Sequence, residues 1–289
     1  MDKNLIQRLI SGAIYGLLIF LCTTEYGALY LNKISPDLVK PHQLFYGLIT
    51  FFLVVGTYEC VKIMKFDSTL YKWLVLPIIA FVYYKLFTYR FFHFGFYFDF
   101  NISEILALSL ILIASITIFK FPDELYYDEG KLIFTVIYTA LPFGFALGLP
   151  WSVNQNFTWV VFLLFVLIWS SDSFAYFTGR LFGKHKMAPK ISPKKTWEGF
   201  AGGVFFTLIL GYFIEQKFPD LRGNWIVVGL LVSIFAPLGD LVESQLKRTF
   251  GVKDSGNIIP GHGGVLDRLD SFIIAAPVVY LYFILERLF

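Results

Sequence analysis

The chain has 289 residues, of which 57% are hydrophobic and only 16% are charged. Soluble globular domains carry about 25% charged residues, so this composition indicates a protein embedded in lipid. It excludes a disordered chain, a disulfide-rich scaffold and a basic nucleic-acid-binding domain. The net charge of +3 is too small to indicate a polyanionic partner, so the positions of the charges are more informative than their sum.

Nine stretches of the sequence are long and apolar enough to cross a membrane, since a helix needs about 20 mostly apolar residues to span the hydrocarbon core. Their apolar residues are continuous instead of alternating, which favours helices over barrel strands. We therefore expect an all-α, polytopic integral membrane protein with nine transmembrane helices. The expected spans are residues 8–30, 44–64, 72–90, 103–120, 131–150, 157–179, 197–215, 225–246 and 266–288.

The positively charged residues predict the orientation of these spans. With the N-terminus placed in the cytoplasm, 17 Lys and Arg residues fall on the cytoplasmic side and 6 on the other side, as the positive-inside rule requires. This arrangement places the loops 180–196 and 247–266 together on the cytoplasmic face. The short loops and the lack of a transit peptide predict a bacterial inner membrane.

The chain divides in character near residue 155. In the N-terminal region, residues 1–155, about five spans contain few ionisable groups, and we expect Glu59 there to be a helix-end residue without a chemical role. In the C-terminal region, residues 156–289, charged residues enter the spans themselves. We therefore expect the catalytic chemistry in the C-terminal region.

Asp172 lies near the inner end of the sixth span, and Tyr176 and Arg180 follow it on the same helical face. A charge buried in a membrane costs about 2.5–3.5 kcal/mol even on the most lenient scale, so an intramembrane carboxylate is by default functional and faces a cavity. The alternative is an ion pair with a basic loop residue that only fixes the end of the helix.

A basic segment without acidic residues follows this span. Its charges can fix the orientation of the protein in the membrane. They can also attract the segment to anionic lipid, by about 1 kcal/mol per basic residue near the surface. It can also form a phosphate clamp, because Ser192, Lys194 and Lys195 lead into the seventh span, whose first N–H groups and dipole favour an anion. The sequence does not decide between the two. The basic residues are Arg180, Lys184, Lys186, Lys190, Lys194 and Lys195.

The densest group of polar residues lies at the end of the eighth span and the start of the ninth. At helical spacing, several of these residues share one face. Mg²⁺ takes one or two protein carboxylates together with water and substrate phosphates, so we expect Asp240 and Asp267 to meet across Mg²⁺ at the cytoplasmic edge. The polar residues are Asp240, Glu243, Ser244, Lys247, Asp267, Arg268 and Asp270.

A glycine-rich loop connects these two spans. Gly263 and Gly264 permit unusual backbone dihedrals and leave no side chain in the way, as a close approach to a phosphate requires. His262, a single histidine between glycines, is more often a structural or solvated residue than a catalytic base.

Residues 244–270 resemble the signature of the CDP-diacylglycerol synthases, which are phosphatidate cytidylyltransferases. Residues 171–199 are similar to the second shared segment of that family. The resemblance covers the last 120 residues closely, and the first half only as a comparable set of spans. The matching signature positions are Ser244, Lys247, Arg248, Lys253, Asp254, His262, Gly263, Gly264, Asp267, Arg268 and Asp270.

The resemblance implies that CMP is transferred from CTP to phosphatidic acid, giving CDP-diacylglycerol and diphosphate in phospholipid synthesis. It implies Mg²⁺ as a cofactor, with room for a second mono- or divalent cation, and a homodimer in the lipid bilayer. Asp240 and Asp267 match the metal-binding aspartates of the family, and Asp172 with the neighbouring lysines matches its other polar cluster.

Phosphoryl-type transfer is catalysed mainly by positioning and charge neutralisation. We therefore assign Mg²⁺ binding to Asp240 and Asp267, and charge neutralisation to Lys194, Lys195 and Arg268. The remaining candidates bind substrate, and no general base is needed because phosphatidate is already largely ionised near neutral pH. The substrate-binding candidates are Asp172, Ser192, Lys247, Arg248, His262, Gly263 and Gly264.

Three alternatives are compatible with parts of this pattern. A CTP-dependent kinase of polyprenol or another lipid alcohol needs the same nucleotide, metal and membrane cavity. An ion-coupled transporter would use intramembrane carboxylates, but it favours internal repeats, which the sequence lacks. A lipid-binding scaffold without turnover would tolerate the loss of single carboxylates.

Overall fold

A computed structural model describes residues 3–92, 102–150, 157–261 and 263–286 of the chain. Each of the nine apolar segments contributes helix to the described residues, and the only strands there form one two-stranded hairpin. The prediction of an all-α membrane protein is therefore confirmed.

Among its described residues, the N-terminal region contains five separate helices and a composite one. A 3-10 turn at Pro122–Tyr126 precedes the composite helix, in which α6 passes through a π-helical turn at Val136–Ala140 into α7. The helices are α1 (Lys3–Thr23), α2 (Tyr26–Ile34), α3 (Pro41–Met64), α4 (Thr69–Phe92), α5 (Ile102–Lys120), α6 (Asp128–Thr135) and α7 (Leu141–Ala146).

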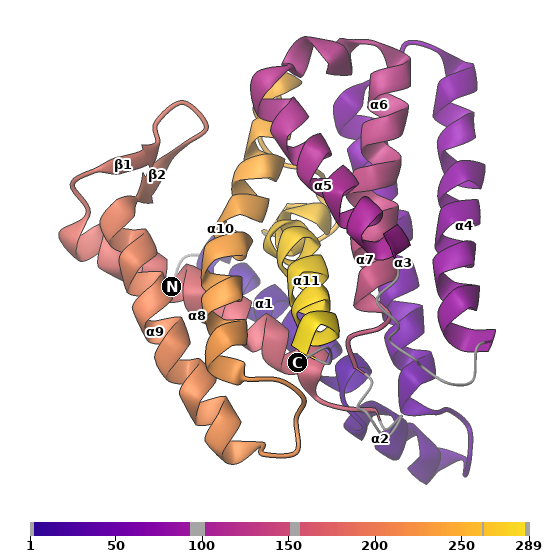
Figure 1. The fold of residues 1–289 in the computed structure, drawn as a ribbon, viewed down its shortest axis with the longest axis vertical. Helices are drawn as coiled ribbons and strands as arrows, with labels where there is room; N and C mark the ends of the chain where they lie inside the picture. Colours follow the sequence, from indigo (N-terminus) through magenta and orange to yellow (C-terminus); the bar gives the residue numbers. More distant parts are fainter. Residues whose placement is uncertain (1–2, 93–101, 151–156, 262, 287–289) are drawn as a thin grey trace.

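The described part of the C-terminal region consists of four long helices and the hairpin. Its elements are α8 (Val160–Phe182), β1 (Lys186–Ala188), β2 (Ser192–Thr196), α9 (Trp197–Lys217), α10 (Trp225–Thr249) and α11 (Leu266–Glu286). Figure 1 shows α11 in the centre of the molecule, with α10 beside it and α9 at the outer edge. The four helices pack against one another, and α11 is the most completely buried of the candidate membrane spans.

Among the described residues, five helices are long and apolar enough to cross a membrane, namely α3, α8, α9, α10 and α11. A sixth span arises only if α1 and α2 are counted as one, because their axes bend by 83°. The expectation of an uninterrupted helix over residues 8–30 is therefore wrong. Near the bend, the Thr23 and Thr24 hydroxyls donate to Ile19 O (2.6 Å) and Phe20 O (2.7 Å), a pattern that often bends helices.

Small residues set the distance between α8 and α9. A Cβ atom on Gly199 would lie 2.6 Å from Ala175 O, and one on Gly203 would lie 3.0 Å from Ser171 O. Glycine at both positions therefore lets the two helices approach closely, which fixes the base of the hairpin relative to α8.

The hairpin corrects the expectation that residues 180–196 form a loop. Helix α8 continues to Phe182, and β1 pairs with β2 in antiparallel orientation, with Lys186 opposite Thr196. Glu198, in the first turn of α9, accepts a hydrogen bond from the Lys184 N–H at 3.0 Å. Figure 1 shows the hairpin projecting beside α9, on the side of the molecule away from α4.

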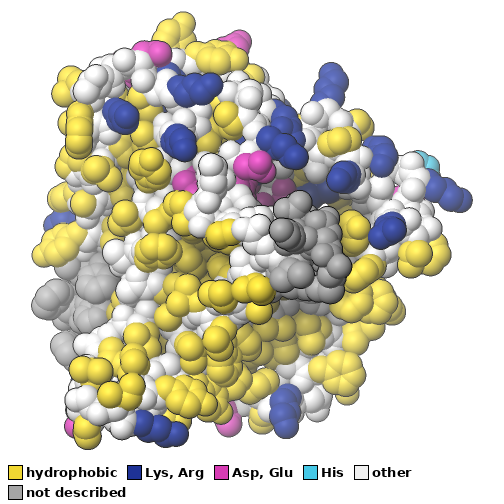
Figure 2. All heavy atoms as spheres, turned by 180° about the vertical axis from the view of Figure 1, so that it is seen from behind, with side chains coloured by type: hydrophobic (Ala, Val, Ile, Leu, Met, Phe, Trp, Pro, Cys, Tyr) yellow, Lys and Arg dark blue, Asp and Glu magenta, His cyan; other side chains and the backbone are white. Residues whose placement is uncertain are grey.

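The surface has a charged end and a broad hydrophobic zone. In Figure 2, Lys and Arg side chains gather in the upper part of the face shown, with acidic side chains among them, and hydrophobic side chains dominate the area below. This separation is typical of a helical membrane protein with its charged loops concentrated on one side.

Candidate active site

Asp240, in α10, is held by a lysine from the hairpin. The Lys195 Nζ atom lies 2.7 Å from Asp240 Oδ2, and it also donates to Pro237 O at 3.0 Å. The Ser244 hydroxyl, one helical turn further along α10, donates to Asp240 Oδ1 at 3.1 Å. Both carboxylate oxygens therefore have a partner, although 31% of the Asp240 side chain is exposed.

The hairpin separates the two lysines that the sequence places together. Successive residues of a strand point to opposite faces, and Lys195 reaches Asp240 whereas Lys194 is exposed. Ser192 pairs with Ala188 in the hairpin. The first free N–H groups of α9 are capped by the Thr196 hydroxyl, which accepts from Gly199 N at 3.1 Å. These residues therefore lie in a strand that leads directly into α9 at Trp197, and their convergence on an anion stays a prediction.

A second lysine, Lys247, links α10 to α11. Its Nζ atom lies 2.7 Å from Glu243 Oε2 and 2.6 Å from Asp267 Oδ1. This contact confirms that residues four apart in α10 share the face that meets α11. The other Glu243 oxygen, Oε1, is buried without a hydrogen-bond partner among the described residues. Arg248 is exposed, and its Nη1 atom donates to Val252 O at 3.3 Å.

The loop before α11 braces the second Asp267 oxygen. Asp267 Oδ2 accepts hydrogen bonds from Ser255 N (2.9 Å), Ser255 Oγ (3.0 Å) and Gly264 N (2.8 Å). Gly263 adopts a φ of +87°, and a Cβ atom there would lie 2.5 Å from Asp267 Oδ2. The glycines thus bring the loop backbone against Asp267, while the expected contact of this backbone with a substrate phosphate stays a prediction. His262 lies outside the described residues.

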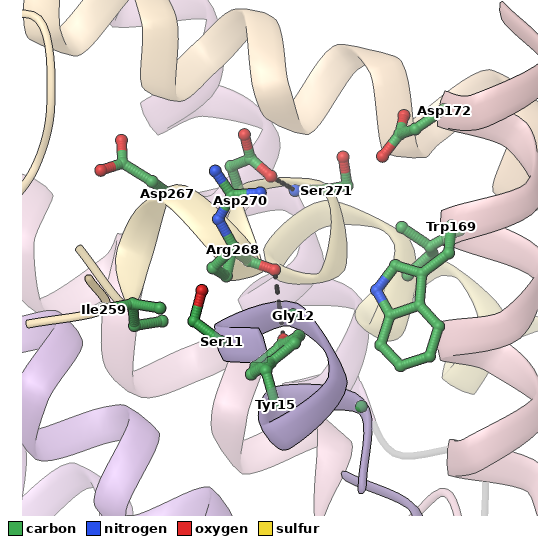
Figure 3. A pocket seen from close by; sticks show the side chains of 12 residues that line it. Ser11, Gly12, Tyr15, Trp169, Asp172, Ile259, Asp267, Arg268, Asp270 and Ser271 are labelled. Atoms are coloured by element: carbon green, nitrogen blue, oxygen red, sulfur yellow. Dashed lines mark hydrogen bonds between the residues drawn. The ribbon is translucent and has the colours of Figure 1, made fainter. Parts of the chain in front are cut away.

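A pocket of about 250 Å³ adjoins these carboxylates. Figure 3 shows Asp172 approaching it from α8, while Asp267, Arg268 and Asp270 approach from α11. Helix α1 forms another wall, where the Tyr15 hydroxyl donates to Arg268 O at 3.4 Å. The lining residues are Ser11, Gly12, Tyr15, Gly16, Ile168, Trp169, Asp172, Ile259, Asp267, Arg268, Asp270 and Ser271.

The site contains more acidic than basic side chains. Asp240 and Asp172 lie near enough to Asp270 for their negative charges to interact with it. Lys195 and Arg268 lie near enough to Asp172 for their positive charges to interact with it. Five carboxylates therefore converge with three basic groups. Among the described residues, no three His, Cys, Asp or Glu side chains come close enough together to hold a metal ion by themselves. The site residues are Asp172, Asp240, Glu243, Asp267 and Asp270, with Lys195, Lys247 and Arg268.

Sequence reasoning missed the contribution of the N-terminal region to this site. Glu59, expected at a helix end, lies inside α3, is 1% exposed and hydrogen-bonds the loop before α11. The signal was present, since a single acidic residue inside an apolar segment is expensive in a membrane. The same argument drew attention to Asp172.

The fold and the site define a helical membrane protein in which acidic and basic side chains gather at one pocket between α1, α8 and α11. The chain belongs to the cytidylyltransferase family, whose model matches residues 7–285. It is 40% identical over 184 residues to the phosphatidate cytidylyltransferase of Bacillus subtilis (strain 168), covering 63% of this chain and 67% of that protein.

A second relative gives the same result. The chain is 39% identical over 187 residues to the phosphatidate cytidylyltransferase of Staphylococcus aureus (strain COL), covering 64% of this chain and 70% of the relative. The resemblance noted in residues 244–270 is therefore confirmed.

Proposed function

We propose that this protein transfers CMP from CTP to phosphatidate, giving CDP-diacylglycerol and diphosphate. Its family and the names of its relatives support this reaction, and they give no support to a polyprenol kinase or an ion-coupled transporter. The observation that carries the proposal is the convergence of acidic and basic side chains from α8, β2, α10 and α11 beside one pocket within a hydrophobic protein.

The chemistry requires one bond to form and one to break. An oxygen of the phosphatidate phosphate attacks the α-phosphorus of CTP, and the bond from that phosphorus to the β-phosphate oxygen breaks, releasing diphosphate. Nucleophile and leaving group are both anionic, so catalysis depends on positioning and charge neutralisation. Lys195 and Arg268 would neutralise charge on the phosphates, while Lys247 holds Asp267 in place.

A divalent cation is part of this proposal, and the excess of carboxylates at the site supports it. Asp240 and Asp267 would hold Mg²⁺, which uses few protein carboxylates when substrate phosphates complete its coordination. The site has an excess of carboxylates over basic groups, and one buried Glu243 oxygen lacks a partner among the described residues. This excess negative charge also leaves room for a second mono- or divalent cation. When bound, Mg²⁺ would supply positive charge to the phosphate oxygens.

The orientation and assembly belong to the same proposal. The Lys and Arg bias predicts a cytoplasmic N-terminus and an active site facing the cytoplasm, the nine apolar stretches predict nine crossings, and the short loops predict a bacterial inner membrane. The charged side chains that gather on one part of the surface support this orientation. A homodimer is proposed from the family resemblance alone.

Label placement tests the reaction. Purified protein in mixed micelles with phosphatidate and Mg²⁺ receives CTP labelled either at the α- or at the γ-phosphate. We expect the α-label in the lipid extract, only when phosphatidate is present, and the γ-label in diphosphate. A γ-label in the lipid would instead establish a lipid kinase, and the absence of either label from lipid would contradict the proposal.

A further inference from the structure

Glu59 is a buried acidic residue of α3 that faces the loop before α11, and the candidate metal ligand Asp267 lies in the first turn of that helix. It is 1% exposed, and no Lys or Arg side chain of the described residues forms an ion pair with it. A buried charge is tolerated only when hydrogen-bond donors or counter-charges compensate it. The position of Glu59 therefore has to be explained by the groups that donate to it.

These donors are the backbone at the start of α11 and a loop hydroxyl. Glu59 Oε1 accepts from Val265 N at 3.0 Å, and Oε2 accepts from Leu266 N at 2.7 Å and Ser255 Oγ at 3.1 Å. The first N–H groups of a helix lack partners within the helix, and the helix dipole favours a negative charge there. Glu59 thus caps α11 with a carboxylate supplied by another helix.

The loop is shaped around this carboxylate. A Cβ atom on Gly256 would lie 2.5 Å from Glu59 Oε1, and one on Gly264 would lie 2.5 Å from both Glu59 oxygens. Any larger side chain at either position would push the loop away from α3. Glycine at Gly264 is therefore required by the contact with Glu59, in addition to any approach of a substrate.

Ser255 connects Glu59 to Asp267. Its Oγ atom lies 3.1 Å from Glu59 Oε2 and 3.0 Å from Asp267 Oδ2. A hydroxyl has one hydrogen to donate, so the two carboxylates compete for it. Glu59 thus fixes the residues immediately before Asp267 and also affects how strongly Ser255 hydrogen-bonds the Asp267 carboxylate.

We propose that Glu59 is a positioning residue of the active site, which sets the location of the Asp267 carboxylate and its availability to a cation through the start of α11 and through Ser255. This inference rests on the proposed function, because it takes Asp267 as a ligand of Mg²⁺. A cap that only stabilises the fold would make the same contacts with the backbone but would not alter the response of the enzyme to Mg²⁺.

The test uses Glu59→Gln in the full-length protein. The amide keeps the size of the side chain, but its NH₂ group cannot accept the hydrogen bonds of the oxygen it replaces. It can donate to Ser255, whose hydrogen then goes to Asp267 and weakens cation binding. We expect turnover to fall about tenfold or more and half-saturating Mg²⁺ to rise about threefold or more, with the KM for CTP changed less than about twofold.

Hydrogen exchange gives a readout that does not depend on activity. In Glu59→Gln, the amide of Leu266 should exchange about tenfold faster, because the NH₂ group that faces Ser255 replaces its acceptor Oε2, whereas the amide of Val265 keeps the oxygen at Oε1 as its acceptor. The matched control is Thr57→Val, a buried position of α3 whose hydroxyl bonds Thr139 at 3.3 Å and not the loop. The control should keep the wild-type kinetics and exchange rates.

The outcomes separate the roles. Wild-type turnover and Mg²⁺ dependence in Glu59→Gln would overturn the proposal, and so would faster exchange with unchanged kinetics. If Glu59→Gln does not fold, Ser255→Ala decides: it removes the hydrogen bond to Asp267, so half-saturating Mg²⁺ should fall, and an unchanged value overturns the proposal. If the wild type shows no turnover, the proposed function fails. Calorimetric measurement of Mg²⁺ binding to wild type and variant then still tests the role of Glu59.

Discussion

Two lysine–aspartate pairs lie in the site, and they are held differently. Asp240 and Lys195 come from α10 and the hairpin, and their side chains are 31% and 22% exposed. Asp267 and Lys247 come from α11 and α10, and theirs are 8% and 11% exposed. The first pair lies partly open, and one of its partners belongs to a projecting hairpin. The second is enclosed and braced by the loop before α11.

This difference suggests that Asp267 is held in a fixed position, whereas Asp240 can change partners when a ligand binds. The position of Asp267 is set before any ligand arrives, because the loop and Lys247 together engage both of its oxygens. Asp240 can exchange Lys195 for a cation or let Lys195 turn to a phosphate, because both groups are accessible. Preorganised charge is the main source of catalysis in phosphate chemistry, and under the proposed function the enclosed pair, Asp267 and Lys247, would supply it.

The largest effect on turnover is expected at the enclosed pair formed by Asp267 and Lys247. Asp267→Asn should lower turnover about 10²–10³-fold, as the loss of a preorganised charge does, and it should change the Mg²⁺ dependence. Asp267→Glu should be nearly as damaging, because the loop N–H groups leave no room for a longer side chain. Diphosphate release is measured for both variants, with thermal unfolding as the check on folding. Near-normal turnover with unchanged Mg²⁺ dependence would remove Asp267 from the metal site.

The partly open pair should tolerate a change of length better than the enclosed pair. Asp240→Asn should lower turnover about 10²-fold, but Asp240→Glu should keep activity within about tenfold, because the carboxylate can adjust its position. The comparison of the two Glu variants is the measurement. Equal losses for Asp240→Glu and Asp267→Glu would show that the two aspartates are held equally tightly.

Two neighbouring lysines of the hairpin distinguish a role in the active site from a role in membrane orientation, because Lys195 pairs with Asp240 and Lys194 does not. Lys195→Met should lower turnover about 10–100-fold, since a hydrogen bond to a charged group contributes about 1.5–3 kcal/mol. Lys194→Met, on the other face of the strand, should change turnover and the apparent KM values for nucleotide and lipid by less than about threefold. Equal effects of the two substitutions would restore the interpretation in which both lysines clamp the phosphates.

The smallest effect on activity is expected at Asp128, whose hydrogen-bond partners do not belong to the site. Burial acts to raise the pKa of Asp128, but hydrogen bonds from Ser68 N, Lys131 and Asp67 N outweigh it and hold the pKa below its usual value. A carboxylate with a lowered pKa stabilises the fold above its unfolded-state pKa, and this contribution is lost as the pH falls through the folded-state pKa.

Asp128→Asn should therefore leave turnover unchanged and lower the thermal midpoint near neutral pH. The difference from wild type should shrink as the pH approaches the acidic range in which Asp128 becomes protonated. Thermal unfolding of both proteins in detergent across this range is the measurement. A difference that grows on acidification would contradict the stated sign.

The sequence predicted the long helices well because they consist of long apolar segments, and it predicted the carboxylates of α10 and α11 because helical spacing puts them on one face. It missed the break between α1 and α2, where the threonines are apolar enough to pass as part of a span. It missed the hairpin, since β1 and β2 are short and rich in lysine. Glu59 was overlooked because its partner Ser255 lies 196 residues away, a contact that only the folded chain reveals.

Our central proposal is that this protein transfers CMP from CTP to phosphatidate at the carboxylate cluster beside the pocket between α1, α8 and α11. The most direct measurement is diphosphate release by purified protein given CTP, Mg²⁺ and phosphatidate, with Asp267→Asn assayed in parallel. We predict release that requires all three components and is nearly abolished in the variant. Release without phosphatidate, no release by the wild type, or equal release by the variant would contradict the account.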